Sequence, residues 1–173
     1  MRVTRSFVEF PLAVGQQVSL PEEVANHLVR VMRLREGESC VLFNGDGHDY
    51  SATLVELGKR SALVRVDAVQ ALDNESPLPI TLLQGIARGE KMDLILQKAT
   101  ELGVQRIVPV NAERTEVKLD AARAEKRLAH WRSVAVSACG QSGRARVPVV
   151  EAPQSLLDAA RASTTDALKL TLD

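Results

Sequence analysis

The stretch from Arg88 to Val110 reads RGEKMDLILQKATELGVQRIVPV, and it decides the fold of the second half of the chain. Its apolar residues recur at the spacing of one helix face, at Met92, Ile95, Leu96, Ala99 and Leu102. Gly103 follows, where helices commonly end. Residues 80–86, ITLLQGI, form a continuous apolar run, which is typical of a strand buried on both faces. With VQRIVPV at 104–110 as the next strand, this order predicts a parallel α/β unit.

The same alternation continues toward the end of the sequence. Residues 120–140 predict a second helix with Asp120 as its N-cap, and residues 155–163 predict a third helix. Short apolar segments at 147–150, VPVV, and at 167–172, ALKLTL, predict two more strands. The sequence after Ile80 therefore predicts an α/β fold with a parallel sheet.

The first seventy residues have a different character, because short alternating strands surround a single helix. Residues 44–47, NGDG, and 58–60, GKR, are turn sequences that connect strand candidates. The strand candidates are SFVEF, QQVSL, SCVLF, YSATLVEL and SALVRV. Several short strands joined by hairpin turns indicate a small β-barrel.

One helix, residues 21–33, interrupts these strands. Ser19 and Glu22 have the spacing of a capping box, and Pro21 lies in the first turn. A linker with two prolines, ALDNESPLP at 71–79, separates the two patterns. We therefore expect a domain at 1–72, a linker at 73–79 and a second domain at 80–173.

Composition excludes several classes of function. A net charge of zero gives no global attraction to nucleic acid, and 3% aromatic residues argue against base stacking on aromatic platforms. No apolar run is long enough to span a membrane, and the first ten residues lack the apolar core of a signal peptide. Cys40 and Cys139 lack metal-ligand spacing, so we expect reduced thiols in a cytoplasmic protein. Walker and dinucleotide-binding motifs are absent from the sequence.

Local charge is more informative than the total. Residues 114–146 hold eight basic and three acidic residues, an excess of five positive charges. Arg88, Glu90, Lys91 and Asp93 fall between a predicted strand and its helix, at the carboxyl edge of the expected sheet, where open parallel sheets bind ligands. The charges are explained either by a solvated loop or by an anion that docks there. The residues alone lead to an α/β domain with a basic loop face and to no particular reaction.

Three segments in the second half resemble one known family in order and spacing: QGIARGEKMDLILQKATELGVQRIVPV, ERTEVKLD and HWRSVAVSACGQSGRARVPVV. In the first half, MRVTRSFV, HLVRVMRLREGE and FNGDGHDYSATL agree with it. The chain thus resembles the ribosomal RNA small subunit methyltransferase E family, the SPOUT-class enzymes that methylate N3 of a uridine in 16S rRNA. The resemblance covers essentially the whole sequence.

The resemblance implies an N-terminal PUA-like RNA-binding β-barrel and a SPOUT-type α/β domain. It implies S-adenosyl-L-methionine as the methyl donor, 16S rRNA or the small ribosomal subunit as the partner, and a homodimer for the complete protein. Family members continue beyond the position of Asp173 with the segment that forms the trefoil knot and the main donor-binding loops. We therefore expect that the 173 residues alone lack the knot segment and are inactive.

Nine residues are candidate RNA contacts: Arg2, Arg5, Arg30, Arg33, Arg88, Lys91, Arg114, Lys118 and Arg144. The resemblance places Arg88 and Lys91 at the rim of the active site. Arg30 and Arg33 are one helical turn apart and are expected to share a helix face. For each of these residues the alternative is a solvated surface charge.

Two features leave the chemistry open. The family usually carries glutamate at the position of Gly140, and no residue of this sequence is supported as a general base. Two other functions therefore remain: a non-catalytic RNA-binding protein, and a small-molecule α/β enzyme with a β-barrel appendage. Binding of the methyl donor would distinguish an enzyme from the non-catalytic RNA-binding protein. RNA binding that weakens steeply with salt would argue against the small-molecule enzyme.

Overall fold

The computed structural model describes residues 4–111, 121–163 and 167–171 of the chain. Its internal contacts divide the chain into two compact units. The first unit comprises Met1–Pro77 and Val136–Val147, and the second comprises Leu78–Ala135 and Pro148–Asp173. The expected limits of an independent first domain, 1–72, stay a prediction; the compact unit also includes a segment from much later in the sequence.

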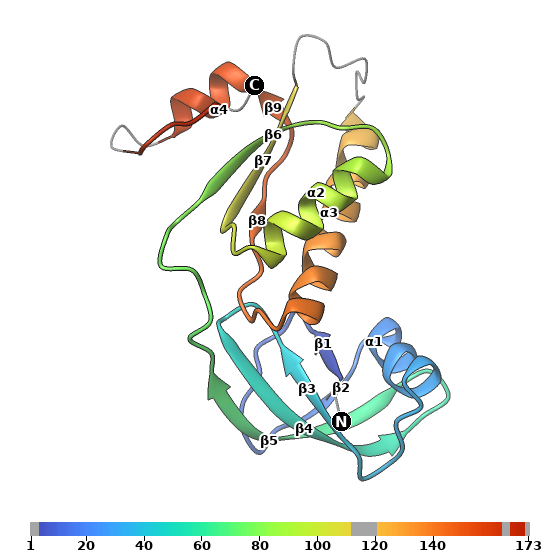
Figure 1. The fold of residues 1–173 in the computed structure, drawn as a ribbon. Coiled ribbons are helices and arrows are strands. Elements are labelled where there is room, and N and C mark those ends of the chain that lie inside the picture. The colour runs from blue at the N-terminus through green and yellow to red at the C-terminus, as the bar shows by residue number, and fades with distance from the viewer. Residues whose placement is uncertain (1–3, 112–120, 164–166, 172–173) are drawn as a thin grey trace. The chain divides into compact units, whose positions relative to one another are not determined.

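A five-stranded sheet forms the first unit, with the strand order β1-β3-β4-β5-β2 (Figure 1). The parallel pair is β1 with β3, and the other pairs are antiparallel. Gly45 and Gly47, with φ of 92° and 96°, make the NGDG turn, as the sequence predicted. The strands are β1 (Arg5–Phe7), β2 (Gln17–Ser19), β3 (Ser39–Phe43), β4 (His48–Leu57) and β5 (Ala62–Ala71).

The core of this unit consists of the alternating inward residues of the sheet together with one helical segment. Leu42, Leu54 and Val64, from β3, β4 and β5, are fully buried in one cluster. Leu28 of the helical segment joins them and is also fully buried. Burial of side chains of this size stabilises the fold by about 1.5–3 kcal/mol each.

The expected helix over residues 21–33 forms in two parts, α1 (Glu22–Asn26) and the π-helix η1 (His27–Val31). The predicted capping box is wrong. Ser19 belongs to β2 and pairs with Leu63 of β5, so the N-cap is Pro21, which supplies no side-chain hydrogen bond. Ser19 is therefore a strand residue and not the helix cap that the local pattern had predicted.

The second unit contains a parallel sheet, as predicted: β6, β8 and β9 each pair in parallel with β7 (Figure 1). The strands are β6 (Thr81–Gly85), β7 (Arg106–Asn111), β8 (Val149–Val150) and β9 (Gln154–Ser155). The helices are α2 (Glu90–Glu101), α3 (Ala121–Ser142), whose residues before Val136 belong to this unit, and α4 (Leu156–Ala162). Predicted N-cap Asp120 lies outside the described residues.

Helices cover both faces of β7, because successive strand residues point to opposite sides. Ile107 packs in one cluster with Leu96 of α2 and Trp131 of α3. Val108 and Val110 pack with Ala159 of α4. The burial on both faces that the sequence predicted for residues 80–86 is wrong, because β6 is only half-buried or exposed along its length. The strand that helices cover on both faces is β7.

Two further predictions for the second unit are wrong. Leu102 is 79% exposed, because α2 ends at Glu101 and Gly103, with φ of 94°, turns the chain away from the helix. The described part of ALKLTL, residues 167–171, forms no strand, and Leu168 and Leu170 are 85% and 78% exposed. An alternating pattern forms a strand only where a neighbouring strand pairs with it.

Candidate nucleic-acid interface

Arg88 and Lys91 lie at the carboxyl end of β6, where the sequence placed them. The amide of Ile86 donates to the carbonyl of Val110 at 3.1 Å and holds the two strand ends together. Gly89 then begins α2 with φ of 52°, a conformation that other residues rarely adopt. Both cationic side chains are exposed beside this turn. An anionic group that approaches the carboxyl edge of the sheet would therefore meet two positive charges.

The acidic residues of the same turn have a different role. Glu90 and Asp93 lie in the first turn of α2, where carboxylates complement the helix dipole. The Asp93 carboxylate is also 2.8 Å from Nε2 of His130 on α3. Asp93 thus connects two helices of the second unit.

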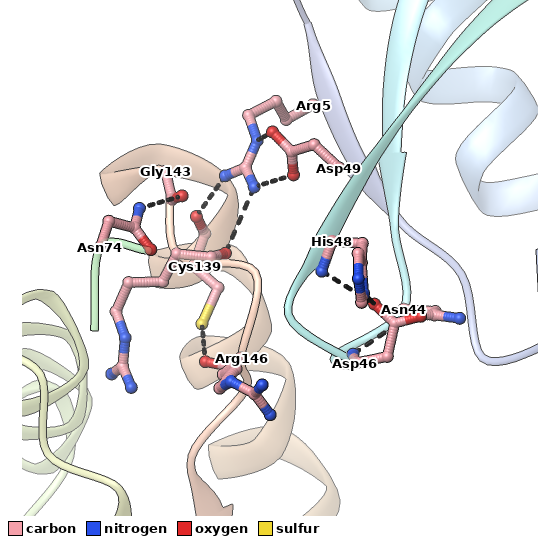
Figure 2. A network of polar contacts seen from close by, with 10 residues as sticks. Arg5, Asn44, Asp46, His48, Asp49, Asn74, Cys139, Gly143 and Arg146 are labelled. Carbon is pink, nitrogen blue, oxygen red and sulfur yellow. Dashed lines mark hydrogen bonds and ion pairs between the residues drawn. The ribbon is translucent and has the colours of Figure 1, made fainter. Parts of the chain in front are cut away.

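Arg5 is held by polar contacts within the first unit (Figure 2). Its guanidinium donates to both carboxylate oxygens of Asp49, at 3.1 and 2.5 Å, and to the carbonyl of Cys139 at 2.9 Å. The guanidinium carbon also lies 4.8 Å from the centre of the Phe43 ring. The side chain is only 12% exposed, so these contacts use the donors that RNA would need. RNA contact by Arg5 stays an untested prediction, and the geometry favours a role in joining β1 to the end of α3.

Arg144 has a similar environment in the same unit. Its guanidinium donates to both carboxylate oxygens of Glu75, at 3.0 and 2.5 Å, and its side chain is 5% exposed. Asn74, beside Glu75, donates to the carbonyl of Gly143 at 2.9 Å (Figure 2). The segment that follows the first sheet is thereby fastened to residues 143–144. The phosphate approach that the sequence suggested at Arg144 is not favoured by this burial.

The position of Gly140 tolerates a side chain. A Cβ built there would meet the carbonyl oxygen of Arg5 at 3.9 Å, which is ordinary van der Waals contact. The backbone therefore does not require the glycine that replaces the glutamate usual in the resembled family.

A polar cluster at the NGDG turn was missed by the sequence analysis (Figure 2). The Asp46 carboxylate accepts hydrogen bonds from the hydroxyl of Tyr50 at 2.6 Å and from the amide of His48 at 2.9 Å. Burial raises the pKa of Asp46, but the hydrogen bonds from Tyr50 and His48 together lower it below its ordinary value. The hydrogen bond to Asp46 raises the pKa of Tyr50 to about 12. The spacing D-x-H-x-Y was the available signal, since alternate residues of β4 share a face.

Tyr50→Phe is expected to lower the free energy of unfolding by about 1 kcal/mol near neutral pH, because Asp46 loses a charge-assisted hydrogen bond. The pKa of Asp46 is lowered in the folded protein, so this contribution is complete above the ordinary value of 3.8 and is lost as the pH falls through the lower folded value. Denaturant unfolding from acid to neutral pH measures it. The same substitution in an Asp46→Asn background should show no such pH dependence, and a pH-independent difference in the native background would contradict the assignment.

Arg30 and Arg33 do not share a helix face, and this prediction is wrong. Arg30 lies in η1, which ends at Val31, whereas Arg33 lies beyond the helix with φ of 57°. Both residues are exposed. No local sequence pattern indicates the π-helix, which changes the direction in which the chain leaves the helix.

Three further candidates, Arg2, Arg114 and Lys118, lie outside the described residues, as does part of the basic stretch 114–146. Both described cysteines are buried, and burial is the main cause that raises the pKa of Cys40 and Cys139 to about 11. Within residues 4–111, 121–163 and 167–171, no cluster of three or more potential metal ligands occurs. In the same ranges, no helix has the length and apolar character that crossing a membrane requires.

Comparison with known proteins identifies the class of protein to which this chain is similar. Residues 20–67 match the family model of an RNA methyltransferase PUA domain, and residues 74–173 match that of an RNA methyltransferase domain. The chain thus carries a match to the RNA methyltransferase domain, preceded by a match to the PUA domain. The expected fold class, a PUA-like domain followed by a SPOUT-type α/β domain, is confirmed.

Individual relatives narrow the class to one family. A crystal structure of ribosomal RNA small subunit methyltransferase E from Neisseria gonorrhoeae, bound to S-adenosyl methionine, is 42% identical with a TM-score of 0.90, over 95% of this chain and 67% of that one. The enzyme of the same name from Bacillus subtilis is 33% identical over 76% of this chain and 52% of its own length. The one from Buchnera aphidicola of Schizaphis graminum is 27% identical over 90% and 63%. The chain belongs to the ribosomal RNA small subunit methyltransferase E family, and it spans between half and two thirds of the length of these two curated relatives.

Proposed function

We propose that a full-length protein containing this chain transfers a methyl group from S-adenosyl-L-methionine to N3 of a uridine in 16S rRNA. The observation that carries the proposal is the position of Arg88 and Lys91. Both are exposed at the carboxyl end of β6 in a parallel sheet, where α/β folds of this kind bind their ligands. The solved relative from Neisseria gonorrhoeae, which binds S-adenosyl methionine, supports the choice of donor.

The proposed chemistry requires charge stabilisation. Uridine N3 carries a proton, and the loss of this proton to solvent water places negative charge on N3 and on the two neighbouring carbonyl oxygens. Cationic donors fixed near those oxygens stabilise the charge as it develops in the transition state. Arg88 and Lys91 are suited to this role because the strand end and the Gly89 turn fix their backbone positions.

A donor site is not assigned to the described residues at this edge. Gly85 and Gly89 are the glycines closest to it, and a Cβ built at either would meet no atom within 4 Å. The space beside both glycines is therefore open.

The proposal also includes the RNA partner, the residues that contact it, the cellular compartment and the oligomeric state. We propose the small ribosomal subunit or its 16S rRNA as the partner, with Arg30 and Arg33 of the PUA domain as further RNA contacts. Arg2, Arg114 and Lys118 stay proposed contacts from the sequence. The protein is proposed to act in the cytoplasm as a homodimer.

Methyl transfer from radiolabelled S-adenosyl-L-methionine to 16S rRNA and to small ribosomal subunits tests the function. A full-length protein containing this chain is expected to produce 3-methyluridine, detected after digestion of the RNA to nucleosides. The Neisseria gonorrhoeae relative serves as a parallel reaction. Label in another nucleoside would refute the N3 assignment. RNA binding without any transfer would instead support the alternative function of a non-catalytic RNA-binding protein.

A further inference from the structure

The exit of the π-helix η1 has an unusual backbone. Residues 27–31 form the π-helical turn, and Arg33, two residues later, has φ of 57°. Arg33 is the one residue other than glycine with positive φ in the described parts of the chain. Single π-turns and left-handed non-glycine residues both occur preferentially at functional sites, because their conformational cost needs a compensating benefit.

This backbone exposes apolar side chains beside buried ones. Leu28 of η1 is fully buried in the core of the first unit. Val31 and Met32, at the end of the same turn, are 66% and 45% exposed. Two adjacent large apolar side chains in solvent contribute little to folding and are available to a ligand.

Three arginines flank this pair. Arg30, Arg33 and Arg35 are exposed, and within the described residues their side chains make no ion pair or hydrogen bond. Other arginines of the same unit differ: Arg60 lies 3.6 Å from the Glu22 carboxylate, and Arg65 lies 2.7 Å from Asp67.

The two acidic residues that follow these arginines are engaged elsewhere. Glu36 accepts a hydrogen bond from the amide of Leu57 at 3.0 Å, and Glu38 accepts one from the amide of Arg35 at 2.8 Å. Both carboxylates thus stabilise the backbone of the loop, and among the described residues neither forms an ion pair with Arg30, Arg33 or Arg35.

We propose that residues 30–35, called here the 30–35 platform, bind unpaired nucleotides of RNA. Val31 and Met32 would contact the face of an unstacked base, and the flanking arginines would contact the phosphates on either side. An unbranched thioether adapts to flat apolar surfaces, which suits this chain with its 3% of aromatic residues. Unpaired nucleotides fit better than a duplex, because only they offer base faces to apolar side chains. The inference rests on the proposed function for RNA as the partner, and it adds the site and the structural class of RNA.

Two double variants of the 173-residue chain test the platform through the salt dependence of binding. A short fluorescent single-stranded RNA and a duplex of the same sequence are the probes, and no methyl donor is present. Arg30→Ala with Arg33→Ala should reduce the slope of log affinity against log salt by about 1.4, since two phosphate contacts are lost. Val31→Ser with Met32→Ser should weaken single-strand binding about fivefold and leave the slope unchanged, as expected for loss of a base contact. Arg60→Ala is the control for loss of an exposed charge and should leave binding to both probes unchanged.

Arg33→Gly provides a second test, because glycine adopts the positive φ without strain. This substitution is expected to raise the melting temperature by about 1–3 °C while it weakens RNA binding. A purely structural residue would not show improved stability together with lost binding.

The possible outcomes distinguish a failure of the 30–35 platform from a failure of the proposed methyltransferase function. Unchanged single-strand affinity in both double variants would refute the platform, even if methyl transfer to 16S rRNA is observed. Stronger binding of the duplex than of the single strand would refute the preference for unpaired nucleotides. A change of molecular mass in solution with Val31→Ser and Met32→Ser, without a change in RNA affinity, would show that the surface joins two copies of the chain.

Discussion

Replacing Glu75 with alanine is expected to lower the free energy of unfolding by about 3–5 kcal/mol, because the change removes the carboxylate that faces a buried guanidinium. Both oxygens of Glu75 accept from Arg144, at 3.0 and 2.5 Å, and the two side chains are only 16% and 5% exposed. A charge in such an environment is costly without its partner. Urea or thermal unfolding of the chain measures the loss.

Two variants make this result specific. Arg60→Ala removes an arginine whose ion pair with Glu22 is exposed, and its effect on unfolding should be close to zero. Glu75→Leu combined with Arg144→Met replaces the buried pair with apolar side chains and should recover much of the stability lost in Glu75→Ala. A loss in Glu75→Ala no larger than that in Arg60→Ala would show that the pair does not hold residues 74–75 to residues 143–144.

The Glu75 result also bears on the extent of the first domain. The compact first unit includes residues 136–147, and the contacts of Arg5 with Cys139 and of Asn74 with Gly143 lie within it. A chain that ends at residue 72 would lack these partners. Independent folding of residues 1–72 therefore stays a prediction, and the structure gives a physical reason to include the later segment in its test.

The elements that the sequence predicted correctly are those defined by local periodicity. The apolar spacing of Met92, Leu96 and Ala99 matches the buried face of α2, and Gly103 ends the helix region. Residues 106–111 form the parallel strand β7, which the sequence predicted at 104–110. Each of these features depends on residues a few positions apart, so a single sequence contains the necessary information.

Whether Arg5 and Arg144 are buried in ion pairs or exposed to RNA depends on residues far away in the sequence. Asp49 lies 44 positions from Arg5, and Glu75 lies 69 positions from Arg144. No local pattern shows that these acids face those arginines, so a buried structural guanidinium and an exposed RNA contact look the same in the sequence. The π-helix is a similar case, because residues 21–33 have an ordinary helical apolar pattern. Only the backbone hydrogen bond from the amide of Met32 to the carbonyl of His27, at 3.0 Å, shows the altered turn.

A full-length protein in which Arg88 and Lys91 are both replaced by alanine is expected to lose about 10²–10³ in the rate of methyl transfer. Both residues are exposed at the carboxyl end of β6, and under the proposed function they stabilise the uridine anion. Their removal should change the melting temperature very little, since exposed charges contribute little to stability. Rate constants under single-turnover conditions, with RNA in saturating amount, separate the chemical step from binding.

Lys98→Ala is the matched control for this double variant. Lys98 is an exposed lysine in the last turn of α2, where it pairs with Glu101 at 2.7 Å. The substitution therefore removes one positive charge from α2 at the end opposite to the proposed site. Its methyl-transfer rate should equal that of the unmodified protein. If Arg88→Ala with Lys91→Ala only weakens RNA binding and leaves the single-turnover rate intact, the two residues hold the RNA backbone and do not stabilise the reacting base. An unchanged rate together with unchanged binding would remove both residues from the active site, and the charge in this turn would then serve only to keep the start of α2 solvated.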